Sequence, residues 1–377
     1  MNIEELFEER KNNPLLNTSY PLSPNDWKEY LKNEPLIFEE GDICFYIHIP
    51  FCKKICSFCE YSKVILPEED VQRRYLEVLG KDILSFLETH KNIRLRGFDI
   101  GGGTPTSLSN QNFDLLLNVF DKVLSRVEIA EDFEPSIEAT FDTINQYKID
   151  RIAKSKIRRI SLGLQSTCDD VLLENNRDNI SFLEIQKVMT DLYSSGVKKI
   201  NLDFMYGIKA QSLESIKNDL KVIKQLKPEQ LTVYELRTNM INIKPYKTSN
   251  ELFEEYSLIF KELSNSGYIA NFGQNTFSLD SSDFGVSSYL RNRMLKGIQY
   301  KGFGISAQSM SVYGVSYNKG KRLCEIRSSL SDETFEENKA YYLPKREVLS
   351  KFIAISGYSG SLDMKAASKI TPVQLTK

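Results

Sequence analysis

The stretch CFYIHIPFCKKICSFCEYSK, residues 44–63, contains four of the chain's six cysteines and decides the expected fold and chemistry. Cys52, Cys56 and Cys59 are spaced C-x3-C-x2-C, whereas Cys44 lies in the apolar run before them. That run is rich in β-branched and aromatic residues and predicts a buried strand. The three cysteines therefore fall in a loop that directly follows a strand, where their thiolates could face one point.

The composition narrows the class of protein. The chain has 377 residues, of which 41% are hydrophobic, and a net charge of −2 from 49 basic and 51 acidic residues. This balance gives no reason to expect nucleic acid or a membrane surface as a partner. No apolar run approaches the roughly 20 residues of a membrane span, and the N-terminus MNIEELFEERKNN does not resemble a secretory signal. We therefore expect a cytoplasmic protein.

Clustered cysteines serve three purposes in proteins: disulfides, zinc sites and iron–sulfur clusters. A reducing compartment disfavours disulfides. Zinc would need histidine or a further close cysteine pair, but His48 and His90 are the only histidines, and Cys168 and Cys324 stand apart. A [4Fe–4S] cluster usually takes four cysteines, so three would leave one iron open to a small molecule. A zinc-binding structural protein remains an alternative hypothesis.

From residue 43 onward, short strand-like runs alternate with amphipathic helical runs. The strand-like runs are 43–50, 94–102, 135–141, 158–166, 198–207 and 230–237, and the helical runs are 68–90, 112–127, 181–196 and 212–226. Such alternation predicts repeated βα units with right-handed crossovers and a parallel sheet. About six units make an α/β fold with a partial (β/α)6 barrel, whose working end lies where the strands finish.

The pattern divides the chain into three expected parts. Residues 1–42 contain turn signals and predict an N-terminal extension, and residues 43–240 form the barrel core. The alternation of strand-like and helical runs becomes irregular in residues 241–377. This part predicts a small C-terminal α+β region that caps the barrel and ends in a helical patch at 346–356.

Five motifs, taken in order, resemble the oxygen-independent coproporphyrinogen III oxidase-like family of radical SAM proteins. They are YIHIPFCKKICSFC, GGGTPT, ISLGLQS, NLDFMYG and GFGISAQSMS, and the resemblance extends from about residue 43 to about residue 360. It implies a (β/α)6 core and a [4Fe–4S] cluster on Cys52, Cys56 and Cys59. It also implies S-adenosylmethionine (SAM) as cofactor, reductive cleavage of SAM to a 5′-deoxyadenosyl radical, and a flavodoxin or ferredoxin-type electron donor.

The resemblance also implies a set of SAM-binding residues. They are Tyr46, Phe58, Gly102, Gly103, Thr104, Glu138, Gln165, Arg177, Asp203 and Gln308. Independent reasoning agrees for some of them, because glycines let a backbone approach a ligand closely and a carboxylate on an apolar strand should be paired or face a pocket. Ordinary core or loop packing is the alternative for each of these residues.

Departures from the family pattern bear on the reaction. The true oxidases have a cysteine at the position of Tyr61, and the haem chaperones have a histidine-bearing segment where this chain has SSYLRNRMLKGIQYKGFG. We therefore expect methyl or one-carbon transfer to a small molecule, with one or two bound SAM molecules. Tetrapyrrole oxidation, anaerobic haem modification and a non-catalytic haem chaperone are the alternatives. No catalytic residue is assigned, and the substrate-facing candidates are Tyr234, Glu235, Arg237, Arg291, Arg293 and Tyr313.

Overall fold

The computed structural model describes residues 28–320 and 323–370, and its core is the predicted partial barrel. All six expected strands are present in this part of the chain. They are β2 (Gly41–Ile49), β5 (Ile93–Gly102), β7 (Ser136–Ala139), β8 (Arg159–Gln165), β9 (Lys199–Tyr206) and β10 (Gln230–Glu235). Each pairs in parallel with the next one in this order. The sheet does not close, because β2 and β10 pair outward with other strands.

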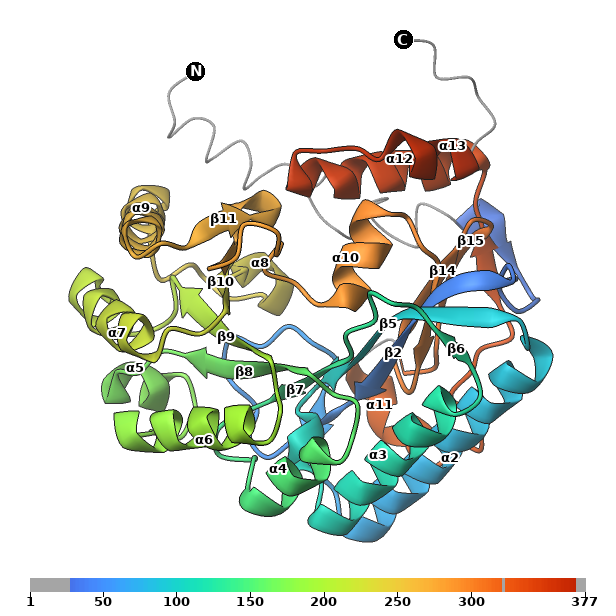
Figure 1. The fold of residues 1–377 in the computed structure, drawn as a ribbon, viewed down its shortest axis with the longest axis horizontal. Coiled ribbons are helices and arrows are strands. Elements are labelled where there is room, and N and C mark those ends of the chain that lie inside the picture. Colours follow the sequence, from blue (N-terminus) through green and yellow to red (C-terminus); the bar gives the residue numbers. More distant parts are fainter. Residues whose placement is uncertain (1–27, 321–322, 371–377) are drawn as a thin grey trace.

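Helices cover the outer face of this curved sheet (Figure 1). They are α2 (Glu69–Thr89), α3 (Asn110–Leu124), α4 (Gln146–Ala153), α5 (Asp169–Glu174), α6 (Phe182–Ser194) and α7 (Leu213–Leu226). The predicted helical runs at 68–90, 112–127, 181–196 and 212–226 are therefore confirmed to within a few residues. Local signals set the helix starts: Ser181 and Glu184 form a reciprocal capping box at the start of α6.

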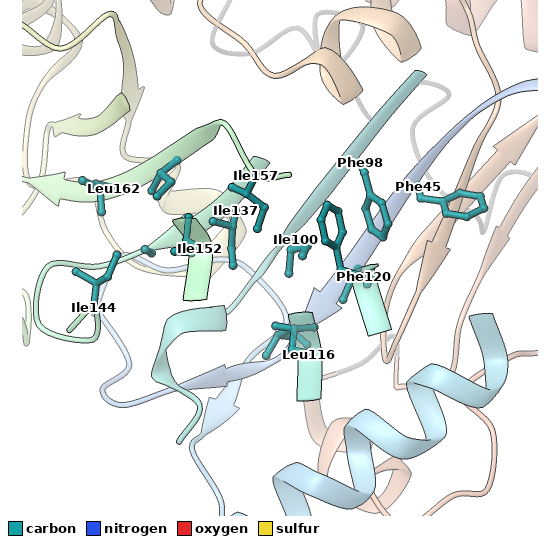
Figure 2. Close-up of a cluster of buried hydrophobic side chains, with 14 of the residues drawn as sticks. Phe45, Phe98, Ile100, Leu116, Phe120, Ile137, Ile144, Ile152, Ile157 and Leu162 are labelled. Carbon is teal, nitrogen blue, oxygen red and sulfur yellow. The ribbon is translucent and has the colours of Figure 1, made fainter. Parts of the chain in front are cut away.

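The main core lies between the sheet and these helices (Figure 2). The ring of Phe98 on β5 lies 4.9 Å from that of Phe120 on α3 and 5.8 Å from that of Phe45 on β2. All three side chains are fully buried. Removing one such ring costs about 3–5 kcal/mol of folding free energy. This packing therefore fixes the positions of β2 and β5, whose ends border the site.

Strands that follow residue 240 extend the sheet at both edges. Beyond β2 lie β13 (Tyr300–Phe303), which pairs in parallel, and then the antiparallel β14 (Gln308–Ser311), β15 (Gly314–Tyr317) and β16 (Ala340–Tyr342). Beyond β10 lie the antiparallel β12 (Thr276–Ser278) and β11 (Ile269–Asn271). Both barrel edges are thereby paired, which protects them from pairing with another chain. The domain boundaries at 42/43 and 240/241 stay a prediction.

The remaining helices belong mostly to the C-terminal part. They are α8 (Thr238–Ile241), α9 (Ser249–Asn265), α10 (Ser288–Leu295), α11 (Leu323–Ser329), α12 (Lys345–Ser356) and α13 (Met364–Ile370), and α12 confirms the helical patch at 346–356. Short 3-10 turns lie at η2 (Lys28–Tyr30), η3 (Pro105–Ser107), η4 (Phe272–Gln274) and η5 (Gly357–Ser359). Within the described ranges, no helix has both the length and the apolar character needed to cross a membrane.

Most of the predicted N-terminal extension, residues 1–27, lies outside the described residues. Of the rest, β1 (Leu31–Lys32) pairs antiparallel with β16. The short strand β6 (Glu128–Ile129) pairs with β5. Two further short strands, β3 (Phe51–Cys52) and β4 (Val64–Ile65), form a parallel ladder apart from the main sheet.

Candidate cluster and cofactor site

The loop that bears the three cysteines begins where β2 ends. The β3–β4 ladder closes the base of this loop: the Val64 N–H donates to the Pro50 carbonyl at 2.7 Å, and the Leu66 N–H donates to the Cys52 carbonyl at 2.9 Å. The three thiols are free, with Cys52 buried and the other two partly buried. The loop therefore presents them together from a closed base.

A cavity of about 250 Å³ lies at the carboxyl ends of the barrel strands, and the three cysteines line it. Nine of the ten predicted SAM-binding residues line the same cavity. They are Tyr46, Phe58, Gly102, Gly103, Thr104, Glu138, Gln165, Arg177 and Asp203. Their elements are far apart in sequence and meet here because parallel strands end at one edge of the barrel. What they bind stays a prediction.

Gln308 is the exception. It lies on β14, where its Oε1 accepts a 2.6 Å hydrogen bond from the Tyr300 hydroxyl and its Nε2 donates to the Tyr317 hydroxyl at 2.9 Å. It is not among the residues that line the cavity. Its local partners account for its polar atoms without a ligand.

The turn after β5 requires its glycines. Gly102 has φ of +115°, which side chains rarely allow. A Cβ on Gly103 would lie 2.7 Å from the Phe51 carbonyl oxygen and 2.9 Å from its nitrogen. A Cβ on Gly101 would lie 2.6 Å from the Glu138 carboxylate. Only glycines let this turn lie directly against the cysteine loop and the floor of the cavity.

A second segment holds the cysteine loop from the opposite side. We call residues 175–178, between α5 and α6, the clamp segment. The Ser57 N–H donates to the Asn175 carbonyl at 3.2 Å, and the Ser57 hydroxyl donates to Asn175 Oδ1 at 3.0 Å. Asn176 Nδ2 donates to the Ile55 carbonyl at 2.8 Å. Lys54 and Asp178 form an ion pair. The sequence singled out only Arg177 in this segment, because the other residues appear there as an ordinary polar loop.

Polar hydrogens surround the cysteine sulfurs. Arg177 Nη1 lies 3.3 Å from Cys56 Sγ, and its Nη2 donates to the Gly163 carbonyl at 2.7 Å. The Thr104 hydroxyl lies 3.8 Å from Cys52 Sγ. Burial raises the pKa of the Cys52 thiol to about 11. A metal that binds the Cys52 sulfur must therefore displace a proton, and the charge of Lys63, which lowers this pKa, favours the resulting thiolate.

Two carboxyl groups face the cavity from β7 and β9. Burial, with repulsion from Asp203, raises the pKa of Glu138 to about 7, although its side chain is open to the cavity itself. Glu138 accepts a 3.1 Å hydrogen bond from the Gly102 N–H. Burial raises the pKa of Asp203 to about 6, and this carboxylate accepts hydrogen bonds from Ser161 and Asn201. These groups can bind a ligand's ammonium or hydroxyl groups.

The donor set fits an iron–sulfur cluster. Three thiols line one cavity beside a guanidinium, and the buried Gln165 Oε1 there has no hydrogen-bond partner. In the described residues no three His, Cys, Asp or Glu side chains converge closely enough to hold a single metal ion. Cluster ligands need no such convergence, because each cysteine binds a different iron.

The substrate-facing candidates separate in space. Tyr234, Glu235 and Arg237 line the cavity, and Arg237 forms an ion pair with Glu60 of the cysteine loop. Three others do not line it: Arg291 lies 3.5 Å from Asp132, Arg293 lies between aromatic rings, and Tyr313 is exposed. The candidates that line the cavity are therefore those that lie on β10 or just after it.

Comparisons with known proteins show which proteins this chain resembles. The radical SAM superfamily profile matches residues 46–223. The heme chaperone HemW of Lactococcus lactis is 28% identical over 318 residues, which cover 77% of this chain and 79% of that protein. The oxygen-independent coproporphyrinogen III oxidase of Escherichia coli is 27% identical over 197 residues, which cover 52% of this chain and 42% of the oxidase.

A solved structure agrees in fold. The coproporphyrinogen III oxidase of Escherichia coli, described as a radical SAM enzyme, matches with a TM-score of 0.75 at 22% identity over 88% of this chain and 79% of that one. The superfamily implies a [4Fe–4S] cluster and SAM. Residues 46–223 therefore match a radical SAM domain, and the chain is similar in sequence to heme chaperones and coproporphyrinogen III oxidases and similar in fold to the solved oxidase.

Proposed function

We propose that this protein is an enzyme that reductively cleaves SAM at a [4Fe–4S] cluster held by Cys52, Cys56 and Cys59. The observation that carries the proposal is one cavity that gathers three free thiols, a guanidinium beside one of them, and two carboxyl groups. When bound and reduced, the cluster supplies the electron that splits SAM into methionine and a 5′-deoxyadenosyl radical. A flavodoxin or ferredoxin-type protein is the proposed donor.

The residues around the cysteines match the groups of SAM. Arg177 is placed to pair with a carboxylate, and Glu138 and Asp203 can accept hydrogen bonds from ammonium or hydroxyl groups. Tyr46 and Phe58 offer aromatic faces to an adenine. We propose that the backbone of residues 102–104 lies against the ligand, because their glycines leave no side chain in the way.

A substrate would meet the radical on the β10 side of the cavity. Tyr61, Tyr234, Glu235 and the Glu60–Arg237 pair form this wall. It offers both charge signs and two phenol rings, so we propose a small molecule with polar groups as substrate. Hydrogen abstraction from this molecule is the first step that we propose after SAM cleavage.

Methyl transfer, which the sequence favoured, draws no support from the two sequence relatives described above, whose names are those of a heme chaperone and an oxidase. Oxidation of the substrate is therefore proposed ahead of it. A test is to supply SAM with a labelled methyl group to the reconstituted, dithionite-reduced protein. Formation of 5′-deoxyadenosine without S-adenosylhomocysteine supports oxidation, whereas S-adenosylhomocysteine formed with transfer of the label supports a methyltransferase with a second SAM.

A haem chaperone is the second candidate, because a relative of that name matches most of the chain. The histidines weigh against histidine ligation of haem in the cavity. His48 contacts the Ser62 carbonyl at 2.8 Å, and burial lowers its pKa to about 4. His90 stacks on Phe86 with the ring centres 4.1 Å apart. Stoichiometric haem binding without SAM cleavage would nevertheless favour the chaperone over the enzyme.

A further inference from the structure

A second, smaller cavity of about 30 Å³ lies in the C-terminal part of the fold, among α10, β13, β14, α12 and α13. Figure 1 shows α12 and α13 on the same side of the molecule as α10 and β14. Two cationic side chains, Arg293 of α10 and Lys351 of α12, line the cavity, and no acidic side chain does. This cavity shares no lining residue with the proposed SAM site.

Lys351 is buried without a partner. Its side chain is only 1% exposed. Across residues 28–320 and 323–370 it has no ion pair within 4.0 Å, and no hydrogen bond to its ammonium is found. Burial lowers its pKa to about 7, and the nearby charge of Arg293 adds to that effect. Lysines are almost never this buried unless they are paired.

Arg293 is oriented but only partly satisfied. Its guanidinium lies over the Tyr300 ring at 4.4 Å and over the Tyr289 ring at 5.5 Å, and its Nη1 donates to the Tyr289 hydroxyl at 3.1 Å. Its Nε is buried and has no hydrogen-bond partner. The rings therefore fix the plane of the guanidinium. The edge that carries Nε, which can bind a carboxylate bidentately, has no acceptor.

We propose that this cavity binds a carboxylate group between Arg293 and Lys351. Two basic side chains without an acidic partner favour an anion, which would hold Lys351 in its charged form. About 30 Å³ is roughly twice the volume that one water needs, which suits a group with two oxygens. Ser311 also lines the cavity, and its Oγ accepts from the Tyr313 N–H at 3.2 Å, so its hydroxyl proton is free to donate.

The carbon end of the ligand would meet apolar side chains. Val348, Phe352, Ile355 and Ile370 line the cavity from α12 and α13. The carboxylate can therefore come from a small free acid or from one end of a larger molecule. In either case the bound anion links α10 to α12 and thus ties the C-terminal helices to the barrel.

The test is isothermal titration of the cluster-loaded, full-length protein at constant ionic strength with sodium acetate, sodium butyrate and sodium phosphate. We expect saturable binding of a carboxylate. Lys351→Met and Arg293→Met should each raise its Kd at least about tenfold, because each removes a charged hydrogen-bond donor. Lys345→Met on the exposed side of the same helix should leave the Kd unchanged.

The titrations of the unaltered protein can already overturn the proposal without any variant, whereas the Arg293→Met and Lys351→Met variants assign observed binding to this cavity rather than to the main one. Tighter binding of butyrate than of acetate assigns the site to the end of a larger ligand, and the reverse assigns it to a small acid. The absence of saturable carboxylate binding overturns the proposal, as does binding of phosphate alone. Acetate binding that Lys351→Met leaves unchanged in a folded variant overturns it as well.

Discussion

Replacing Asn175 with alanine is expected to loosen the cysteine loop and to destabilise the protein. The Asn175 side chain is 1% exposed and joins three parts of the structure. Its Nδ2 donates to the Val171 carbonyl at 2.7 Å and to the Lys209 carbonyl at 2.9 Å, and its Oδ1 accepts from the Ser57 hydroxyl at 3.0 Å. Alanine would leave all three partners without this contact, and the carbonyl of Val171 would lose it in a buried region.

The size of the effect follows from these three bonds. Each contributes about 1 kcal/mol net, so the loss amounts to about 3 kcal/mol of the free energy of unfolding. Unfolding entropy is about 2.1 cal/mol/K per residue, or about 0.8 kcal/mol/K for a chain of 377 residues. The melting temperature should therefore fall by about 4 °C. The loosened loop should also retain less iron after anaerobic reconstitution.

Two neighbouring asparagines supply matched controls for the same substitution. Asn176 is exposed, its side chain donates one hydrogen bond, to the Ile55 carbonyl, and its φ is +56°, where alanine is less favourable than asparagine. Asn176→Ala should therefore lower the melting temperature by about 2 °C, half the effect of Asn175→Ala. Asn179 is exposed, and Asn179→Ala should change nothing. Thermal melts followed by circular dichroism, with iron analysis, give the comparison. Equal melting temperatures and iron contents for Asn175→Ala and Asn179→Ala would refute the reasoning.

Three further outcomes are expected at the main site. Gly103→Ala should destabilise the protein by about 1–3 kcal/mol and weaken SAM binding, because the added Cβ would press on the backbone of the cysteine loop. A Cβ on Gly357 would meet nothing within 4 Å, so Gly357→Ala should leave the stability measured by chemical denaturation unchanged. Equal stabilities of the two variants would contradict this reasoning. SAM affinity should rise between pH 6 and 8, because Glu138, with a pKa of about 7, becomes anionic and attracts the cationic ligand. In equilibrium binding measurements, Glu138→Gln should flatten this rise. An unchanged pH dependence in the variant would assign the rise to another group. Arg177→Lys should raise the Kd for SAM about tenfold or more, because one ammonium cannot keep the contacts with Cys56 and Gly163 and also pair with a carboxylate; an unaltered Kd would remove this residue from the site.

Much of the barrel could be predicted from the sequence, because local patterns determine it. Each core strand is a short apolar run buried on both faces, and each helix has an apolar stripe, so periodicity alone placed them. The cysteine spacing and the glycines after β5 pointed to residues that line one cavity, because both lie at strand ends. Parallel strands bring such ends together whatever the distance along the chain.

Features that depend on contacts between distant segments could not be predicted. Asn175 holds the cysteine loop across 118 positions of the sequence, and nothing local distinguishes it from Asn176. Gln308 lies in a motif of the family, yet its neighbours on the sheet satisfy its side chain away from the cavity. The pairing of strands after residue 240 with both barrel edges was equally invisible, because short strands carry little periodicity.

The central claim is that Cys52, Cys56 and Cys59 hold a cluster that cleaves SAM. The most direct measurement is the amount of 5′-deoxyadenosine formed from SAM by the anaerobically reconstituted, dithionite-reduced protein, compared with Cys56→Ala and with Cys168→Ala, a partly buried cysteine outside the cavity. We expect 5′-deoxyadenosine from the unaltered protein and from Cys168→Ala, and none above background from Cys56→Ala. A fully loaded cluster that forms no 5′-deoxyadenosine, or equal formation by Cys56→Ala, would contradict it.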